Sequence, residues 1–417
     1  METKHSITVK LMNTFRYIVL LILILFIKID AISQVFPPEK KLIFEAVPEM
    51  PRPEYLKPVS DPTFGSVIIR ITDKAVFDSI KPGLRPFHHY PKNQPWNSDG
   101  SLILLDGWPG AVLDGNIYKF VRYVDPPTEP HGWSNTKPNI VYGTNKPNLL
   151  VKLDVSTNIT QTIREFSEYS YISYGDQEGS PSNDDRYISL ICKKPSNEID
   201  IVVYDLLKNK VVSKMDIPEW PNNCTISQSG KYVLVQYMTD STGPKQGLCA
   251  YNLKDLSFIR NIMALSIHYD VGYDTEGNEV VVCSDRDHNS RAVIMTRIDN
   301  GKKTTLLSPE KMSWPMHISC RNIKRSGYAY LSEFAESYSE PDKPNAQKIF
   351  ALKLDPAANG DALTEIFSHE WHSDVVEEDR CPFGVPNRDG SKVMFRSDWM
   401  NGKGEINSYV TFMPTVK

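Results

Sequence analysis

The sequence has few cysteines for its length. Six are spread over 417 residues, and no two of them stand in a C-x-x-C arrangement. Small disulfide-stapled domains are dense in cysteine, so this chain must instead rely on an apolar core. We therefore expect most of the thiols to be buried and to act as small apolar side chains.

The chain also lacks an excess of positive charge. Its net charge is −4 and its pI is about 6.2, and we find no arm or face rich in arginine or lysine. This balance argues against nucleic acid as a partner. A G-x-S-x-G motif is absent as well, which argues against a serine hydrolase of the nucleophile-elbow type.

One apolar run stands near the N-terminus. Residues 17–27 (YIVLLILILFI) follow three basic residues, and small residues at 31 and 33 come after them. This order predicts a secretory signal peptide over residues 1–33, and hence an exported protein that is periplasmic or secreted. A run of eleven residues is short of the roughly 20 needed to span a bilayer, so we expect no stable membrane insertion after cleavage. An uncleaved anchor is the alternative.

A polar turn followed by an alternating apolar strand recurs along the chain. Seven copies occur, at residues 96–105 (WNSDGSLILL), 133–142, 181–190, 226–235, 273–282, 322–331 and 386–395. A second strand–turn–strand pattern alternates with the first, so each period contains about four short strands. Periods of roughly 40–50 residues with four strands are typical of propeller blades.

We therefore predict an all-β, seven-bladed β-propeller with four-stranded blades over residues 66–417. Two β-sandwich domains or a β-helix are the alternatives, but neither accounts for seven similar turns at this spacing. Residues 66–72 (SVIIRIT) and 408–413 (SYVTFM) are strands at opposite ends of the repeats. Their pairing would close the ring and remove a sheet edge. The proline-rich residues 34–65 would wrap around the outside.

Polar residues precede each turn, in what we call its lead-in segment. In a propeller these segments enter the innermost strands from one face, so their side chains should converge. The lead-in segments contain His88, His89 and Tyr90; Glu129 and His131; Tyr174 to Glu178; Asn222 and Asn223; His268 and Asp270; His317; and Asp379 and Arg380. Five of the nine histidines lie in this set, which predicts a shared cleft.

Two groupings within these segments indicate chemistry. His89, His131, Tyr174 and Arg380 would suit β-elimination from a uronic acid, because imidazole and phenol transfer protons and arginine neutralises a carboxylate. A second grouping is His268, Cys283 and His317, whose side chains are zinc ligands in other proteins. Two hydrogen-bonded histidines and a buried thiol are the alternative to one zinc ion.

Several stretches resemble a known family. PWNSDGSLILL, EGSPSNDDRYISL and GVPNRDGSKVMFRSDW are similar to the TolB-like propeller repeats of secreted polysaccharide lyases, among them the oligogalacturonate lyases and the propeller-type ulvan lyases. The resemblance covers about residues 66–413, and HHYPKNQPWNSDG and EPHGWSNTKPN carry it furthest.

The resemblance implies site residues. Histidines and a tyrosine would act as base and acid, at His89, His131 and Tyr174, with Arg380 or Lys194 at the carboxylate, and a mostly structural zinc would be present. Oligogalacturonate lyases carry metal-binding histidines before the last turn, whereas this chain has Arg380-Cys381-Pro382 there. That departure leaves open a dehydration, in which water is the leaving group.

The sequence thus predicts a carbon–oxygen lyase that acts on uronic-acid-containing polysaccharides or oligosaccharides, with a sugar or water as leaving group. A non-catalytic TolB-like propeller that binds glycans or proteins is the alternative. A hydrolase would need paired carboxylates, for which Asp176, Glu178 and Asp270 are available. Trp108 and Tyr123 could stack on sugars or pack against a neighbouring blade. The sequence does not decide the oligomeric state.

Overall fold

The computed structural model describes residues 35–175, 179–238, 246–265, 268–286, 290–313, 317–332, 342–373, 381–400 and 405–414. The predicted signal peptide lies outside these residues. Among the helices that are described, none has the length and apolar character needed to cross a membrane.

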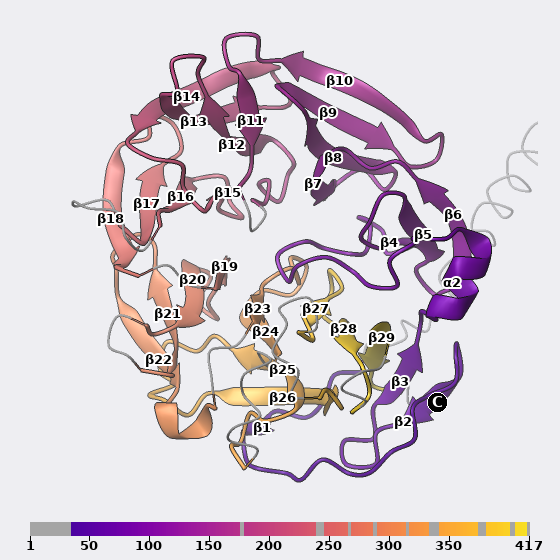
Figure 1. Ribbon diagram of the computed structural model, residues 1–417. Coiled ribbons are helices and arrows are strands. Elements are labelled where there is room, and N and C mark those ends of the chain that lie inside the picture. Colours follow the sequence, from indigo (N-terminus) through magenta and orange to yellow (C-terminus); the bar gives the residue numbers. More distant parts are fainter. Residues whose placement is uncertain are drawn as a thin grey trace, which may run out of the picture. The chain divides into compact units, whose positions relative to one another are not determined.

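Seven antiparallel sheets are arranged in a ring, which confirms the predicted propeller (Figure 1). Blade 1 consists of β4 (Leu102–Leu104), β5 (Gly110–Asp114) and β6 (Phe120–Val124). Blade 2 consists of β7 (Glu129–Trp133), β8 (Ile140–Asn145), β9 (Leu149–Asp154) and β10 (Ile159–Glu165). Blade 3 consists of β11 (Tyr171–Ser173), β12 (Tyr187–Lys193), β13 (Ile199–Asp205) and β14 (Lys210–Ile217). Blade 4 consists of β15 (Asn223–Ile226), β16 (Tyr232–Gln236), β17 (Leu248–Asn252) and β18 (Phe258–Met263). Blade 5 consists of β19 (Tyr269–Tyr273), β20 (Glu279–Ser284), β21 (Val293–Arg297) and β22 (Lys303–Leu307). Blade 6 consists of β23 (His317–Ser319), β24 (Tyr328–Ser332), β25 (Lys348–Lys353), β26 (Leu363–His369) and β1 (Lys40–Lys41).

Blade 7 closes the ring. It consists of β27 (Val385–Pro386), β28 (Lys392–Ser397), β29 (Asn407–Phe412), β3 (Val67–Arg70) and β2 (Pro58–Ser60). The C-terminal strand β29 pairs with β3, with Phe412 opposite Val67 and Tyr409 opposite Arg70. The predicted pairing of the two end strands is therefore confirmed, and it removes the open edges that an unclosed sheet would expose.

Five of the seven repeated turns share one geometry. In each of these five, a short side chain at the start of the turn accepts a hydrogen bond from the backbone N–H at, or just before, the first residue of the strand that follows. Such bonds join Asn97 to Leu102 (3.1 Å), Ser182 to Tyr187 (3.0 Å), Ser227 to Tyr232 (3.1 Å), Asp274 to Asn278 (2.8 Å) and Asn387 to Lys392 (3.0 Å). The Asn, Ser and Asp residues of the repeat are thus explained by local side-chain-to-backbone bonding.

Blade 1 departs from the predicted four strands. Three strands form its sheet, and a single bridge from Trp96 to Ile103 stands where the innermost strand would lie. The segment before β4 instead reaches into the middle of the ring (Figure 1). There Gln94 donates to the carbonyls of Arg321 and Pro386, and Ser319 donates to the carbonyl of Pro91. Proline at 91 and 95 lacks the N–H that a regular inner strand needs.

A polar network crosses the channel at the turn end of the blades. Arg321 binds the Asp270 carboxylate through two nitrogens, at 3.0 and 2.7 Å, and both residues are buried. Gln228 donates to the carbonyls of Val271 and Cys320, and Arg388 donates to that of Asn97. These bonds occupy the turn face, and the lead-in segments lie at the opposite face.

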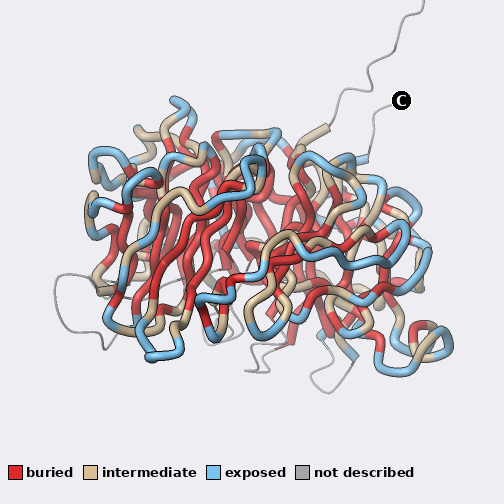
Figure 2. Tube along the Cα trace, turned by 90° about the horizontal axis from the view of Figure 1, so that it is seen from above, coloured by how far each residue is buried: buried red, intermediate tan, exposed pale blue. Residues whose placement is uncertain are grey.

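The apolar core lies between neighbouring blades. One cluster, for example, joins Leu234 and Leu248 of blade 4 to Val281 and Ile294 of blade 5. Figure 2 shows the strands as buried and the connecting turns as exposed. Helix α2 (Lys74–Ile80) adds Phe77 to the core beside blade 1.

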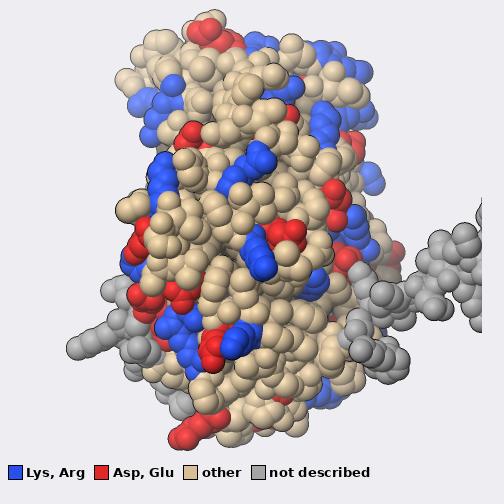
Figure 3. All heavy atoms as spheres, turned by 90° about the vertical axis from the view of Figure 1, so that its right-hand side faces the viewer, with Lys and Arg blue, Asp and Glu red and all other residues tan. Residues whose placement is uncertain are grey.

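The outer side of the molecule mixes charges of both signs. Among the described residues on the face in Figure 3, lysine and arginine are interspersed with aspartate and glutamate. Local ion pairs such as Lys74–Asp78 contribute to this pattern.

Candidate functional site

His131 and Tyr174 meet on the lead-in face. His131 lies on β7 and Tyr174 follows β11, and their rings stack with centroids 3.6 Å apart and planes 28° apart. Both side chains are buried. Among the described residues, neither imidazole nitrogen of His131 nor the hydroxyl of Tyr174 has a hydrogen-bond partner. Buried polar groups without partners are rare in folded proteins and call for a functional or structural explanation.

Burial keeps both groups uncharged near neutral pH. It lowers the pKa of His131 to about 3, with the Arg321 guanidinium as a second cause. It also raises the pKa of Tyr174 well above its usual value, helped by the Glu129 carboxylate. The pair thus presents an uncharged imidazole and an uncharged phenol, the protonation states that a base and an acid have before a proton transfer.

A second cluster joins three lead-in segments. The Tyr90 hydroxyl and His268 Nδ1 are 2.5 Å apart, and the rings of His268 and His317 have centroids 4.8 Å apart. The Tyr90 ring also contacts that of His317 edge-on at 5.6 Å. Tyr90 reaches these histidines of blades 5 and 6 because its segment crosses the middle of the ring.

Lys92 supplies positive charge at this cluster. Its side chain is buried, and its Nζ lies 4.0 Å from the centroid of the Tyr269 ring. Burial lowers the pKa of His268 to about 4, and the charge of Lys92 adds to this effect. Sequence reasoning missed Lys92, although it is the lone cation in a lead-in segment rich in histidine and tyrosine.

Strand β15 of blade 4 stands between the two clusters. The Cys224 N–H donates to the carbonyl of Tyr174 at 3.2 Å, while Asn223 Oδ1 accepts from the Tyr269 hydroxyl at 2.8 Å. We call the set Tyr90, Lys92, His131, Tyr174, His268 and His317 the lead-in cluster. Blades 1, 2, 3, 5 and 6 each contribute at least one of its residues, which agrees with the predicted convergence.

The two histidines at the start of blade 1 face different surroundings. His88 is buried, and its Nε2 donates to the carbonyl of Phe383 at 2.6 Å. His89 is half-exposed; its Nδ1 accepts from the Tyr90 N–H at 2.8 Å, and its Nε2 lies 3.9 Å from the Asp106 carboxylate. His89 therefore lines a separate hollow and is not part of the lead-in cluster.

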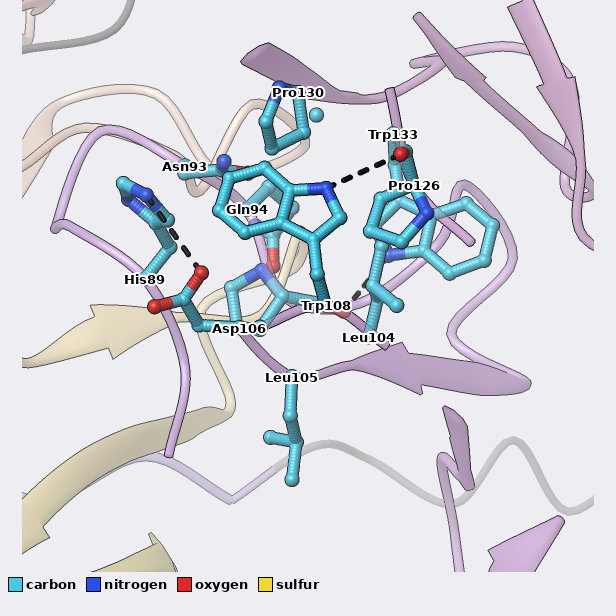
Figure 4. Close-up of a pocket in the computed structure, with 13 residues that line it drawn as sticks. His89, Asn93, Gln94, Leu104, Leu105, Asp106, Trp108, Pro126, Pro130 and Trp133 are labelled. Carbon is cyan, nitrogen blue, oxygen red and sulfur yellow. Dashed lines mark hydrogen bonds and ion pairs between the residues drawn. The ribbon is translucent and has the colours of Figure 1, made fainter. Parts of the chain in front are cut away.

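That hollow lies between blades 1 and 2. It is lined by His89, Asp106, Trp108, Pro130 and Trp133, among others (Figure 4). Its cavity volume of about 30 Å³ exceeds the roughly 10–15 Å³ that one water needs, but a sugar ring does not fit inside it.

Two residues, Arg380 and Lys194, were expected from the sequence to bind the substrate carboxylate. Arg380 lies outside the described residues. Lys194 lies 3.2 Å from Asp200 and 3.3 Å from Glu198 within blade 3, so its charge is already matched there.

The predicted zinc site is not assembled in the part of the chain that the structure describes. No group of three His, Cys, Asp or Glu side chains there could hold a metal ion. His268 and His317 are neighbours, as predicted, but Cys283 belongs to the apolar cluster between blades 4 and 5. His268 is bonded to the Tyr90 hydroxyl and the Cys283 thiol is buried in the core, so the reaction proposed for this site involves no metal.

Comparison with known proteins places the fold. No protein-family model matches the chain, and no curated protein matches it in sequence. Among solved structures, an oligogalacturonate lyase from Vibrio parahaemolyticus superposes with a TM-score of 0.61 at 13% identity, over 91% of this chain and 99% of that one. An oligogalacturonate lyase in complex with manganese superposes with a TM-score of 0.60 at 14% identity, over 91% and 98% of the two chains. At such low identity the likeness concerns the fold: this chain is a seven-bladed β-propeller with the architecture of oligogalacturonate lyase.

Proposed function

We propose that the protein is an exported carbon–oxygen lyase that acts by β-elimination on acidic polysaccharides or oligosaccharides containing uronic acid. The observation that carries the proposal is the lead-in cluster, in which the stacked His131 and Tyr174 lie on the same face as the Tyr90–His268–His317 group and the buried Lys92. Proton-transfer groups with strongly shifted pKa values in one place are typical of active sites. The fold shared with oligogalacturonate lyase supports the same class of reaction.

The chemistry requires three roles. A base removes the proton at C5 of the uronate, next to the carboxylate, and the electron pair of that C–H bond forms the C4–C5 double bond as the C4–O bond breaks. A cation offsets the charge that develops on the carboxylate in the transition state. An acid protonates the departing oxygen, so that atoms and charge balance without water or an oxidant.

The lead-in cluster contains candidates for each role. A neutral histidine, His131 or His268, would accept the C5 proton. A phenol, Tyr174 or Tyr90, would protonate the leaving oxygen. Lys92 would offset the carboxylate charge, with Arg380 as a further candidate from the sequence. The leaving group is a sugar in a polysaccharide lyase and water in an oligosaccharide dehydratase, and the same residues would serve both.

The test uses the protein without residues 1–33 and a panel of oligosaccharides from pectin, ulvan and glucuronan. Product formation is followed by the ultraviolet absorbance of the 4,5-unsaturated uronate and by the appearance of reducing ends. Absorbance with new reducing ends indicates a lyase, and absorbance alone indicates a dehydratase. Reducing ends without absorbance indicate a hydrolase, and binding without any product indicates a non-catalytic glycan-binding propeller; either result overturns the proposal.

A pair of lysine variants tests the site. We expect Lys92→Met to lower kcat/KM by roughly 10²–10³-fold, the usual loss when one group that stabilises developing charge is removed. Lys254→Met makes the same change at an exposed lysine of blade 4 and should leave kcat/KM within about twofold. Equal activity of the two variants would exclude Lys92 from the reaction.

A further inference from the structure

Trp108 is a large apolar side chain that the fold leaves in solvent. It lies in the loop between β4 and β5 on the lead-in face, and 61% of it is exposed. Its indole N–H points to the carbonyls of Pro126 and Pro127 at 3.3 Å. Scattered exposed apolar residues are common, but these contacts hold the orientation of this ring, so an open indole face is presented to solvent.

Trp108 separates two hollows between blades 1 and 2. The inner one contains the His89–Asp106 pair, and Figure 4 shows the indole standing between that pair and Trp133. The outer one is open and is lined by Trp108, Asp125, Pro126, Thr128, Asn145, Lys146, Leu149 and Thr160. Trp108 and Pro126 therefore form a wall common to both.

The hollows carry polar groups suited to a sugar. On the inner side Asp106 accepts from Arg85 at 2.9 Å and lies 3.9 Å from His89 Nε2. On the outer side Lys146 is exposed, and no carboxylate of the described residues lies within ion-pair distance of it. Asp125, in the same hollow, accepts from Asn158 at 3.0 Å. The Lys146 ammonium lies 5.9 Å from the centroid of the Tyr171 ring, in the hollow that Trp108 also lines. An aromatic face and an ammonium in one hollow favour an acidic pyranose, whose C–H face can pack on the indole while its anionic group meets the lysine.

We propose that Trp108 and Lys146 of the outer hollow form a binding subsite for one acidic sugar residue of a glycan chain, with the His89–Asp106 pair on the other side of the indole. This inference rests on the proposed function, because it assumes that the chain binds acidic glycans. The inner hollow adjoins the lead-in cluster through the backbone: His89 and Tyr90 are consecutive, with Cα atoms about 3.8 Å apart, and only Tyr90 faces the cluster.

The experiment measures binding and turnover separately. Oligosaccharides from pectin, ulvan and glucuronan, with neutral xylo-oligosaccharides as controls, are titrated by calorimetry into the wild type and into Trp108→Ala and Lys146→Met. Matched controls are Phe258→Ala and Lys254→Met, two exposed residues of blade 4. We expect Trp108→Ala to raise Kd and KM at least roughly tenfold, as for a tryptophan at the centre of an interface. Lys146→Met should weaken binding of the acidic glycans, with an effect that shrinks as salt is added.

The outcomes separate this inference from the proposed function. Unsaturated product with unchanged Kd and KM in both variants overturns the subsite and leaves the lyase. Glycan binding that Trp108→Ala abolishes, without any product from the wild type, supports the subsite and overturns the lyase. Failure of the wild type to bind any of these oligosaccharides overturns the subsite, as does an equal loss of affinity in Phe258→Ala.

Discussion

Replacing Tyr174 with phenylalanine should make the protein more stable and less active. The hydroxyl of Tyr174 is buried and has no hydrogen-bond partner among the described residues. In the unfolded chain the same group is hydrated, so folding loses its hydrogen bonds to water without replacing them. Tyr174→Phe removes this loss and keeps the ring, which stacks on His131 and belongs to the core of blade 3.

The size of the effect follows from the cost of an unmade hydrogen bond. Burying a polar group without a partner costs about 1–3 kcal/mol. We therefore expect the free energy of unfolding to rise by about 1 kcal/mol or more in Tyr174→Phe. In the same Tyr174→Phe variant, the loss of a general acid should lower kcat by roughly 10²–10⁴-fold. Higher stability with lower activity is the usual signature of a group retained for function.

Tyr169→Phe provides the matched control. Tyr169 is also buried, but its hydroxyl donates to the buried Asp200 carboxylate of blade 3 at 2.7 Å. Hydrogen bonds to charged groups contribute about 1.5–3 kcal/mol, so this variant should lose stability by that order and keep its activity. The assay is urea unfolding followed by circular dichroism, with reversibility checked, beside the ultraviolet product assay.

The reasoning fails if the two variants behave alike. Equal destabilisation would mean that the Tyr174 hydroxyl has a partner in solution. Increased stability with full activity would mean that the hydroxyl is unpaired but plays no part in catalysis.

Two further predictions concern pH and the backbone. The pKa values of His131 and His268 are lowered from 6.5 to about 3 and about 4, so between these values and 6.5 the unfolded chain binds protons that the folded chain does not. Stability should thus be fully present above about pH 6.5 and fall as the pH drops toward 3–4, by up to about 1.4 kcal/mol per pH unit for each histidine. Urea midpoints measured across this range should show a shallower slope in His131→Gln, and an unchanged slope would mean that His131 titrates normally. Gly175 has a φ of +94°, and a Cβ there would lie 2.1 Å from the Asn222 carbonyl oxygen, whereas Gly277 has a φ of +82° and open space around it. Gly175→Ala should therefore lower the melting temperature well beyond Gly277→Ala, whose cost is about 1–2 kcal/mol of left-handed backbone strain; similar shifts would show that the tight contact relaxes.

The architecture could be predicted because it depends on sequence patterns that are only a few residues long. Each blade begins with a turn whose Asn, Ser or Asp bonds to nearby backbone, and the strands that follow alternate in polarity. The count of turns gave the number of blades, and the strand-like residues at 66–72 and 408–413 gave the closure by β3 and β29. Blade 1 differs because its inner segment bonds across the channel to blades 6 and 7, a preference that no local pattern reveals.

The site could be predicted only in part. The position of these residues before a turn was enough to predict that His131 lies near Tyr174 and His268 near His317, because equivalent segments of a ring must converge. It was not enough to distinguish His88, His89 and Tyr90, whose consecutive side chains leave an irregular backbone in different directions. Cys283 was grouped with the histidines by residue type, whereas the strand alternation of β20 directs it into the core.

Sequence alone determined the number of blades, the strand that closes them and the face on which polar residues gather, since these depend on turns and alternation within a few residues. Tertiary structure decided which of those residues lose water, which find partners and which remain without one. Such properties arise from atoms far apart in the sequence, as when Tyr90 meets His268, 178 positions away, and they set the pKa values and charges on which any chemistry here depends.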